Sequence, residues 1–190
     1  MVVNFEFLGG EPIENNITCM NFKVDKVVFF GYNEVIAEQK ERTVKFLKKY
    51  CEVQSVVFNQ LARADLQSVL NSMRAVVKRE IDKGNQIYFD VTGGESLLLV
   101  AFGMLSKEFD TPMHMYDIAG DRLVELNDGS KHSISREVPK RKIPMSLKLL
   151  VKMHGGKINR NMHKNSKVVD DEDTVDDVEK IYYTAKANWD

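Results

Sequence analysis

Residues 87–105 read IYFDVTGGESLLLVAFGML, and this stretch decides the fold. Its first part, Ile87 to Val91, is apolar and rich in β-branched and aromatic residues apart from Asp90, which predicts a strand. A pair of glycines follows, and residues 95–109 have the length and apolar content of a helix. A strand that passes through a short loop directly into a helix is part of a βαβ unit. The stretch therefore predicts a parallel sheet.

The same alternation of strand and helix extends outward on both sides of this stretch. Strands are predicted over residues 2–8, 26–32, 53–58, 87–91 and 113–118, with a further short strand over 124–126; helices are predicted over 38–50, 66–83 and 95–109. Asp65 is a good N-cap for the second of these helices, and Gly84 is a suitable stop for it. The order implies right-handed crossovers and a mainly parallel sheet with helices on both faces. We predict a Rossmann-like α/β domain over residues 1–127.

Composition excludes several classes of protein. The chain has 190 residues, of which 43% are hydrophobic, so it can bury a core. Lys and Arg total 27 against 28 Asp and Glu, which argues against a uniformly basic nucleic-acid coat. No apolar run reaches the roughly 18–20 residues that span a bilayer, and no leader opens the chain. Cys19 and Cys51 encode no disulfide framework or Cys-rich metal site. We expect a cytoplasmic protein with no membrane partner, metal or cofactor.

The composition changes after Asn127. Between residues 139 and 167 there are nine Lys or Arg and no acid, and residues 170–179 hold seven acids and no base. Residues 146–153 are predicted to be a helix, and a last helix is predicted from about residue 174. We therefore treat residues 128–190 as a charged linker and helical extension, and as a possible start of a truncated effector region. The basic residues 140–167 are either a nucleic-acid contact or a solvated face.

Two loops that follow predicted strands are the sharpest candidate site. The first runs from Leu8 through Gly9, Gly10, Glu11 and Pro12 to Asn16, and the second is Asp90-Val91-Thr92-Gly93-Gly94-Glu95-Ser96. In an open parallel sheet, ligands bind beyond the carboxyl ends of the strands, where the strand order reverses. Paired glycines let an anion reach backbone amides, and the helix after the second loop adds unpaired amides and partial positive charge. Thr92 and Ser96 can also donate hydroxyl hydrogen bonds to a phosphate.

Other interpretations of the same residues stay open. A glycine pair after a strand is also the tight turn that a βα unit needs, and Glu11 and Glu95 oppose an anion unless they point away or bind ribose hydroxyls. Neither loop is a G-x-G-x-x-G or Walker A motif, which disfavours a dinucleotide cofactor or triphosphate hydrolysis. No nucleophile elbow is present. His114 lies in a predicted strand and is expected to be a packed side chain rather than a base.

These segments together resemble one known family. The opening strand followed by LGGEPIENNI, the strand KVVFFGY, and the strand, loop and helix FDVTGGESLLLVAFGML are similar to CRISPR-associated Rossmann-fold (CARF) domains, particularly those that precede restriction-endonuclease-like ancillary nucleases. The resemblance covers roughly residues 1–127. Its most specific part is Asp90 to Ser96, which is similar to the family's D-x-T-G-G-T-K loop.

The resemblance implies a function in antiviral defence. It implies a homodimeric sensor that binds a cyclic oligoadenylate, most often cyclic tetra-adenylate, and controls a downstream nuclease allosterically. The ligand contacts implied for this chain belong to the two loops, with one more residue just after the second predicted strand. They are Gly9, Gly10, Glu11, Pro12, Asn33, Thr92, Gly93, Gly94, Glu95 and Ser96.

Two departures from the family qualify this interpretation. Ser96 stands where the family loop ends in Lys, and Glu95 replaces Thr, so one charge-assisted phosphate contact is lost. No nuclease motif follows residue 150, so a catalytic effector would be missing from this chain. Two alternatives stay open. One is a weak, metal-independent ring nuclease in which a ribose 2′-hydroxyl attacks the ring phosphate and Thr92 and Ser96 position it. The other is a ligand-responsive DNA-binding transcription regulator.

Overall fold

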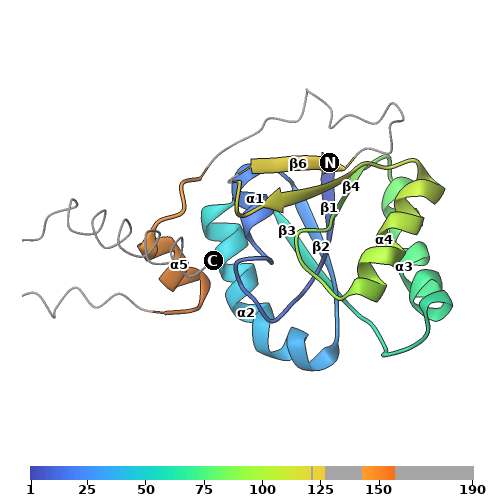
Figure 1. Ribbon diagram of the computed structural model, residues 1–190, viewed down its shortest axis with the longest axis horizontal. Coiled ribbons are helices and arrows are strands. Elements are labelled where there is room, and N and C mark those ends of the chain that lie inside the picture. The colour runs from blue at the N-terminus through green and yellow to red at the C-terminus, as the bar shows by residue number, and fades with distance from the viewer. Residues whose placement is uncertain (121, 127–142, 157–190) are drawn as a thin grey trace, which may run out of the picture. The chain divides into compact units, whose positions relative to one another are not determined.

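The computed structural model of the protein describes residues 1–120, 122–126 and 143–156 (Figure 1). The chain divides into two compact units, Met1–Ile143 and Pro144–Asp190. The predicted domain boundary after residue 127 falls at a segment outside the described residues and stays a prediction. The helix predicted from about residue 174 also lies outside them.

The first unit is a six-stranded sheet with helices on both faces. In chain order its elements are β1 (Val2–Phe7), α1 (Ile17–Asn21), β2 (Lys26–Gly31), α2 (Asn33–Tyr50), β3 (Ser55–Gln60), α3 (Leu66–Ile81), β4 (Gln86–Asp90), α4 (Ser96–Phe109), β5 (Met113–Asp117) and β6 (Arg122–Leu126). The strand order is β3-β2-β1-β4-β5-β6, and every neighbouring pair is parallel except β5 with β6. Figure 1 shows α3 and α4 on one face of the sheet and α1 and α2 on the other. The predicted Rossmann-like α/β fold is confirmed.

The bounds of several elements differ from the predicted ones; β6, for example, begins at Arg122 rather than at residue 124. The short helix α1 was not predicted, because five residues carry no clear period. The helix predicted from residue 38 begins at Asn33. β3 lies two residues later than predicted, because Glu52 turns the chain with φ of 55° and Val53 donates its amide to the end of α2, at Leu47 O. Only with Ser55 does the chain pair with β2.

The face covered by α3 and α4 is an apolar core. Alternate residues of β1 point into it, and Phe5 stacks on Phe30 of β2 at 5.9 Å and contacts Phe89 of β4 at 5.5 Å between ring centroids. Phe102 of α4 closes over both Phe30 and Phe89. Each buried phenylalanine contributes about 1.5–3 kcal/mol. As predicted, Asp65 caps α3, and its carboxylate accepts the Ser68 amide at 3.1 Å.

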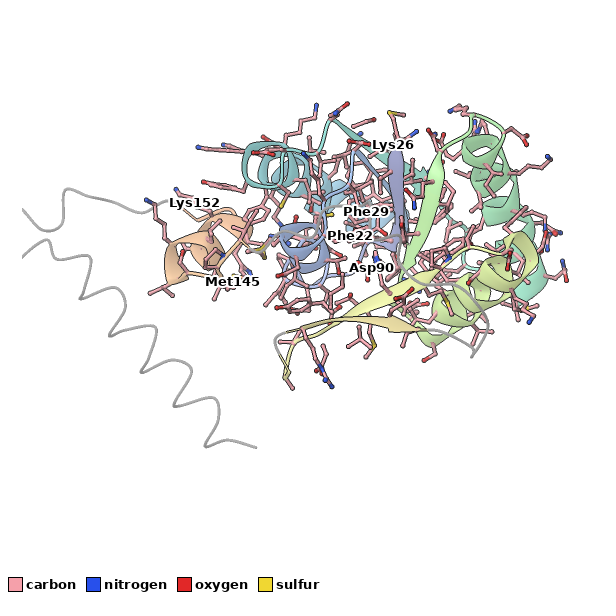
Figure 2. All side chains as sticks on the ribbon, turned by 90° about the horizontal axis from the view of Figure 1, so that it is seen from above. Phe22, Lys26, Phe29, Asp90, Met145 and Lys152 are labelled. Carbon is pink, nitrogen blue, oxygen red and sulfur yellow. The ribbon has the colours of Figure 1, made fainter. Side chains whose placement is uncertain are left out.

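The face covered by α1 and α2 contains a buried polar layer beneath the two candidate loops. Its members lie on β1, α1, β4 and β5, and all are almost fully buried: Asn4, Glu6, Thr18, Cys19, Asp90 and His114. Figure 2 labels Asp90 and also Phe22, an aromatic neighbour in this layer. His114 packs as expected, with its ring stacked on Tyr88 and edge-on to Phe22. Burial lowers the pKa of His114, although the charge of Asp90 opposes this.

Glu6 is the costly member of this layer. Burial raises its pKa well above the ordinary value, the nearby charge of Asp90 raises it further, and hydrogen bonds from Asn4 and Cys19 compensate only in part. A group whose pKa is raised by folding contributes stability fully below its unfolded pKa and loses it as the pH rises through the folded pKa.

We therefore expect Glu6→Gln to stabilise the protein at high pH. The neutral amide avoids the cost of burying a carboxylate, so the variant should exceed the parent by about 1 kcal/mol or more at pH 8. The advantage should shrink as the pH falls through about 4.5, because below the unfolded-state pKa Glu6 becomes protonated in both the folded and the unfolded state. Urea unfolding of the parent and the variant at several pH values measures this difference in stability and its dependence on pH.

Glu80 is the matched control for this prediction. It is also buried, and burial alone would raise its pKa, but ion pairs with Lys83 at 2.7 Å and Lys26 at 3.0 Å lower it instead. Glu80→Gln should therefore destabilise the protein at pH 8. Equal effects of the two substitutions would contradict the assigned cost of Glu6.

In the second unit the structure describes one helix, α5 (Leu147–Met153). Its boundaries match the prediction: the Ser146 hydroxyl accepts the Leu149 amide at 3.2 Å, and Gly155 ends the turn after it with φ of 79°. No helix within the described residues is long and apolar enough to cross a membrane.

Candidate ligand-binding site

The strand order reverses between β1 and β4. β1 pairs with β2 on one side and β4 on the other, and both pairings are parallel. The chain therefore leaves the carboxyl ends of two adjacent strands toward opposite halves of the sheet. The first loop, residues 8–16, follows β1, and the second loop, residues 91–95, follows β4. In open α/β sheets this reversal is where ligands bind.

The first loop is held by side-chain amides. Asn15 brackets Gly9, accepting its amide at 2.8 Å and donating to its carbonyl at 2.9 Å. Gln39 of α2, fully buried, donates to the Gly10 carbonyl at 2.8 Å. Asn16 donates to the Pro12 carbonyl. The backbone of this loop is thus fixed, and its Gly9 amide is already engaged.

Thr92 anchors the second loop. Its amide and its hydroxyl both donate to Asp90 Oδ1. The hydroxyl oxygen also accepts the Tyr116 amide of β5 at 2.8 Å and lies 2.9 Å from the Thr18 hydroxyl of α1. Because its one proton goes to Asp90, Thr18 donates to it. The hydroxyl of Thr92 therefore ties the loop to two neighbouring elements.

The two loops touch at Gly93. A Cβ atom at this position would stand 2.8 Å from Cβ of Glu14 and would overlap its carboxylate. Gly94 has φ of 138°, and a Cβ there would meet Phe7 and Leu99 at 3.2 Å. Both members of this glycine pair are therefore required, Gly93 by the close approach and Gly94 by its conformation as well.

Glu95, the N-cap residue of α4, belongs to a small charged cluster on the α4 side of the site. The Tyr32 hydroxyl, at the end of β2, donates to Glu95 Oε2 at 2.7 Å. Arg63, in the loop after β3, lies 3.6 Å from Glu95 and 2.7 Å from Glu34 of α2. Its guanidinium also lies 4.0 Å from the centre of the Tyr32 ring. Burial and the bond to Glu95 raise the pKa of Tyr32, which keeps it a donor.

The first turn of α4 offers backbone donors beside this cluster. The Leu98 and Leu99 amides donate to the Glu95 carbonyl, while the Ser96 and Leu97 amides have no hydrogen-bond partner among the described residues. The Glu95 side chain does not cap the helix. Unpaired amides and the positive end of the helix suit an anion.

The predicted contact residues lie at one edge of the sheet, but they differ in their exposure to solvent. The exposed ones are Gly10, Glu11, Asn33, Gly94, Glu95 and Ser96. The half-buried ones are Gly9, Thr92 and Gly93, and Pro12 is buried. Their roles toward a ligand stay predictions. The internal bonds of Gly9 and Thr92 show that these two residues also shape the loops themselves.

Carboxylates outnumber cations at this edge. Glu11 and Glu14 belong to the first loop, and Glu34 and Glu95 pair with Arg63. Burial raises the pKa of Glu14, and the charge of Glu11 adds to this effect. Within the described residues, no three His, Cys, Asp or Glu side chains come together in an arrangement suited to a metal ion.

Sequence reasoning missed three side chains that shape this site, and it placed a fourth, Asn15, in the first loop without giving it a role. Asn15 follows the first glycine pair, but its bond back to Gly9 needs the folded loop. Gln39, Tyr32 and Arg63 come from elements distant in sequence. The positions of Tyr32 and Arg63 at or just after strand ends could have signalled residues at the carboxyl edge of the sheet.

Solved structures share this fold at low sequence identity. Can2 from Sulfobacillus thermosulfidooxidans, in complex with cyclic tetra-adenylate, matches with a TM-score of 0.62 and 12% identity, covering 80% of this chain and 39% of that chain. Protein VC1899 from Vibrio cholerae matches with a TM-score of 0.61 and 13% identity, covering 69% and 34%. A type III CRISPR defence DNA nuclease activated by cyclic oligoadenylate has a TM-score of 0.57 and 13% identity, covering 80% and 23%.

The chain shares the Rossmann-like fold of these CARF-domain proteins. No protein-family model matches this chain, and no curated protein is similar to it in sequence. The chain spans less than two fifths of the length of each of these three proteins. The likeness thus rests on the arrangement of strands and helices.

The conformation of Gly94 predicts that a side chain at this position lowers the stability of the domain. Gly94→Ala should lower the free energy of unfolding by about 1–3 kcal/mol, because a side chain there is strained at positive φ and crowds Phe7. Gly10→Ala is the control, since nothing lies within 4 Å of a Cβ at that position. Urea unfolding should separate the two variants, and equal stabilities would contradict the prediction.

Proposed function

We propose that this chain is the sensor domain of a type III CRISPR ancillary effector and binds a cyclic oligoadenylate, with cyclic tetra-adenylate as the expected ring. The observation that carries the proposal is the meeting of two glycine-paired loops at the reversal of strand order, beside the unpaired first-turn amides of α4. Backbone donors of this kind suit phosphates, which a cyclic oligoadenylate carries at every nucleotide. The shared fold with Can2 supports the same ligand class.

We propose further that two copies form the complete site. A cyclic tetra-adenylate has two-fold symmetry, which matches a homodimer axis through the ring. On α4, directly after the second loop, three apolar side chains spaced along one side are exposed: Leu97 (37%), Val100 (52%) and Met104 (47%). This stripe is continuous with the site and supplies the apolar surface that a dimer would bury.

Ligand binding would then act on an effector beyond the CARF fold. The chain covers 39% of Can2 and 23% of the CRISPR defence nuclease, so those proteins contain much more than the part that aligns with it. In our proposal, closure of the loops around the ring is passed to residues 128–190 and from there to an effector domain.

The test is calorimetric titration with cyclic tri-, tetra- and hexa-adenylate. We expect one ring bound per dimer at micromolar affinity or better, with cyclic tetra-adenylate strongest. Gly93→Asp should reduce the affinity by at least about a hundredfold, because its side chain would collide with Glu14 and add a negative charge.

Ala75→Asp is the matched control, since it adds the same charge at an exposed position of α3. It should leave ring binding unchanged. Absence of binding to all three rings would refute the proposed function.

The dimer is tested by mass in solution. Val100→Asp should raise the dimer dissociation constant at least about tenfold, because it places a charge in the middle of the apolar stripe. Sedimentation equilibrium measures this, again with Ala75→Asp as control. A monomeric parent protein, or an unchanged dimer in Val100→Asp, would contradict the proposed interface.

Ring cleavage is distinguished in the same samples by chromatography of the nucleotide after incubation. Thr92 and Ser96 are the predicted positioning residues, but the Thr92 hydroxyl is engaged by Asp90 and Tyr116. Ser96 is the exposed hydroxyl of the pair.

For the basic residues 140–167, only positions 143–156 are described, and the alternative of a DNA-binding regulator stays a prediction.

A further inference from the structure

The candidate site has an unusual charge balance for a ligand with several phosphates. Four carboxylates, those of Glu11, Glu14, Glu34 and Glu95, stand around it, and the second loop carries no cation of its own. Backbone amides alone would have to overcome this repulsion. A side-chain cation is therefore the contact that the site most needs.

Arg63 is placed to supply it. Within the described part of the chain, it is the only Lys or Arg side chain that forms an ion pair with a residue of either loop. It reaches Glu95 from the loop after β3, a strand that does not adjoin β4. The guanidinium therefore lies beside the side chain of Glu95, the residue that directly precedes the unpaired amides of Ser96 and Leu97.

The guanidinium is held in orientation by its neighbours, but few of its hydrogen-bond donors are used. It lies over the Tyr32 ring at 4.0 Å and donates one hydrogen bond, from Nη2 to Glu34 at 2.7 Å. An arginine has five N–H donors, so most of them stay available. Its side chain is 65% exposed, which leaves it open to a ligand.

We infer that Arg63 supplies the phosphate-binding cation of this site, held in place by the ring of Tyr32 and the carboxylate of Glu34. The inference rests on the proposed function for the identity of the ligand. Ser96 cannot make a charge-assisted contact. In this inference, Arg63, which follows a different strand, makes that contact instead. A planar guanidinium suits this role because it can donate two parallel hydrogen bonds to one phosphate while its face stays on the tyrosine.

The test compares ring binding by arginine variants in the full chain. Arg63→Ala should weaken cyclic tetra-adenylate binding about tenfold to a hundredfold, the usual range for a charge-assisted hydrogen bond. Arg63→Lys should recover part of the loss, since it keeps the charge but not the planar fork. The control is Arg74→Ala, which removes an arginine paired with Glu108 away from the loops and should bind normally.

A double-mutant cycle separates direct contact from general charge effects. Glu34→Gln frees Arg63 from its partner and should tighten ring binding by about threefold. In the Arg63→Ala background, the same substitution should give a smaller gain. An equal gain in both backgrounds would overturn the inference, because Glu34 would then act on the ligand without Arg63.

Inorganic tripolyphosphate makes the result independent of the ring. Its binding is followed by ³¹P NMR in the parent protein and in Arg63→Ala. If the rings bind and Arg63→Ala changes nothing, the inference fails while the proposed function stands. If no ring binds but tripolyphosphate binds only when Arg63 is present, the proposed function fails and the phosphate site stands. If neither ligand depends on Arg63, the inference is wrong.

Discussion

Parallel pairing of β1 with β4 is the constraint on which the rest of the structure depends. The pairing joins the two halves of the sheet, and it places the carboxyl ends of two strands side by side although about 80 residues separate them. The loops after these strands must then share one space, which is why Gly93 packs against Glu14 with no room for a Cβ atom. Everything that the site offers, from the braced Gly9 to the open amides of α4, follows from that proximity.

Beneath the loops, the protein keeps a polar layer where an apolar one would be more stable. Thr92 bonds to Asp90, Thr18 and the backbone of β5, so that the second loop is fastened to the layer below it. The cost is a buried Glu6 whose ionisation Asp90 opposes. On the opposite face of the sheet, the core that α3 and α4 bury is made of hydrophobic side chains, many of them aromatic. The face covered by α1 and α2 also buries apolar side chains such as Phe29 and Phe46, so both faces contribute to stability, and the polar layer holds the second loop in place.

The charge pattern around the site has consequences for what it can bind. Acidic side chains on three elements repel any polyanion that is not met by donors in fixed positions. If the proposed function holds, such a site would discriminate by geometry, because only a ligand whose phosphates meet the α4 amides and the guanidinium of Arg63 would gain enough to overcome the repulsion. The carboxylates are also acceptors for ribose hydroxyls, so the same groups that repel phosphate can favour a ring of nucleotides.

Much of this architecture was determined by local sequence. The apolar runs, the Asp65 cap and the glycine pairs act within a few residues, so strands, helices and both loops could be predicted from them, as could the packed state of His114. The missed elements have non-local causes: α1 is too short for a period, and β3 begins only where its partner strand allows. Tertiary structure alone decided that Asn15 would occupy the Gly9 amide, that Gln39 would hold Gly10, and that Arg63 would meet Glu95. The Asn15 contact needs the closed conformation of its own loop, whereas Arg63 meets Glu95 because the sheet orders its strands differently from the chain, and that order is set by long-range packing.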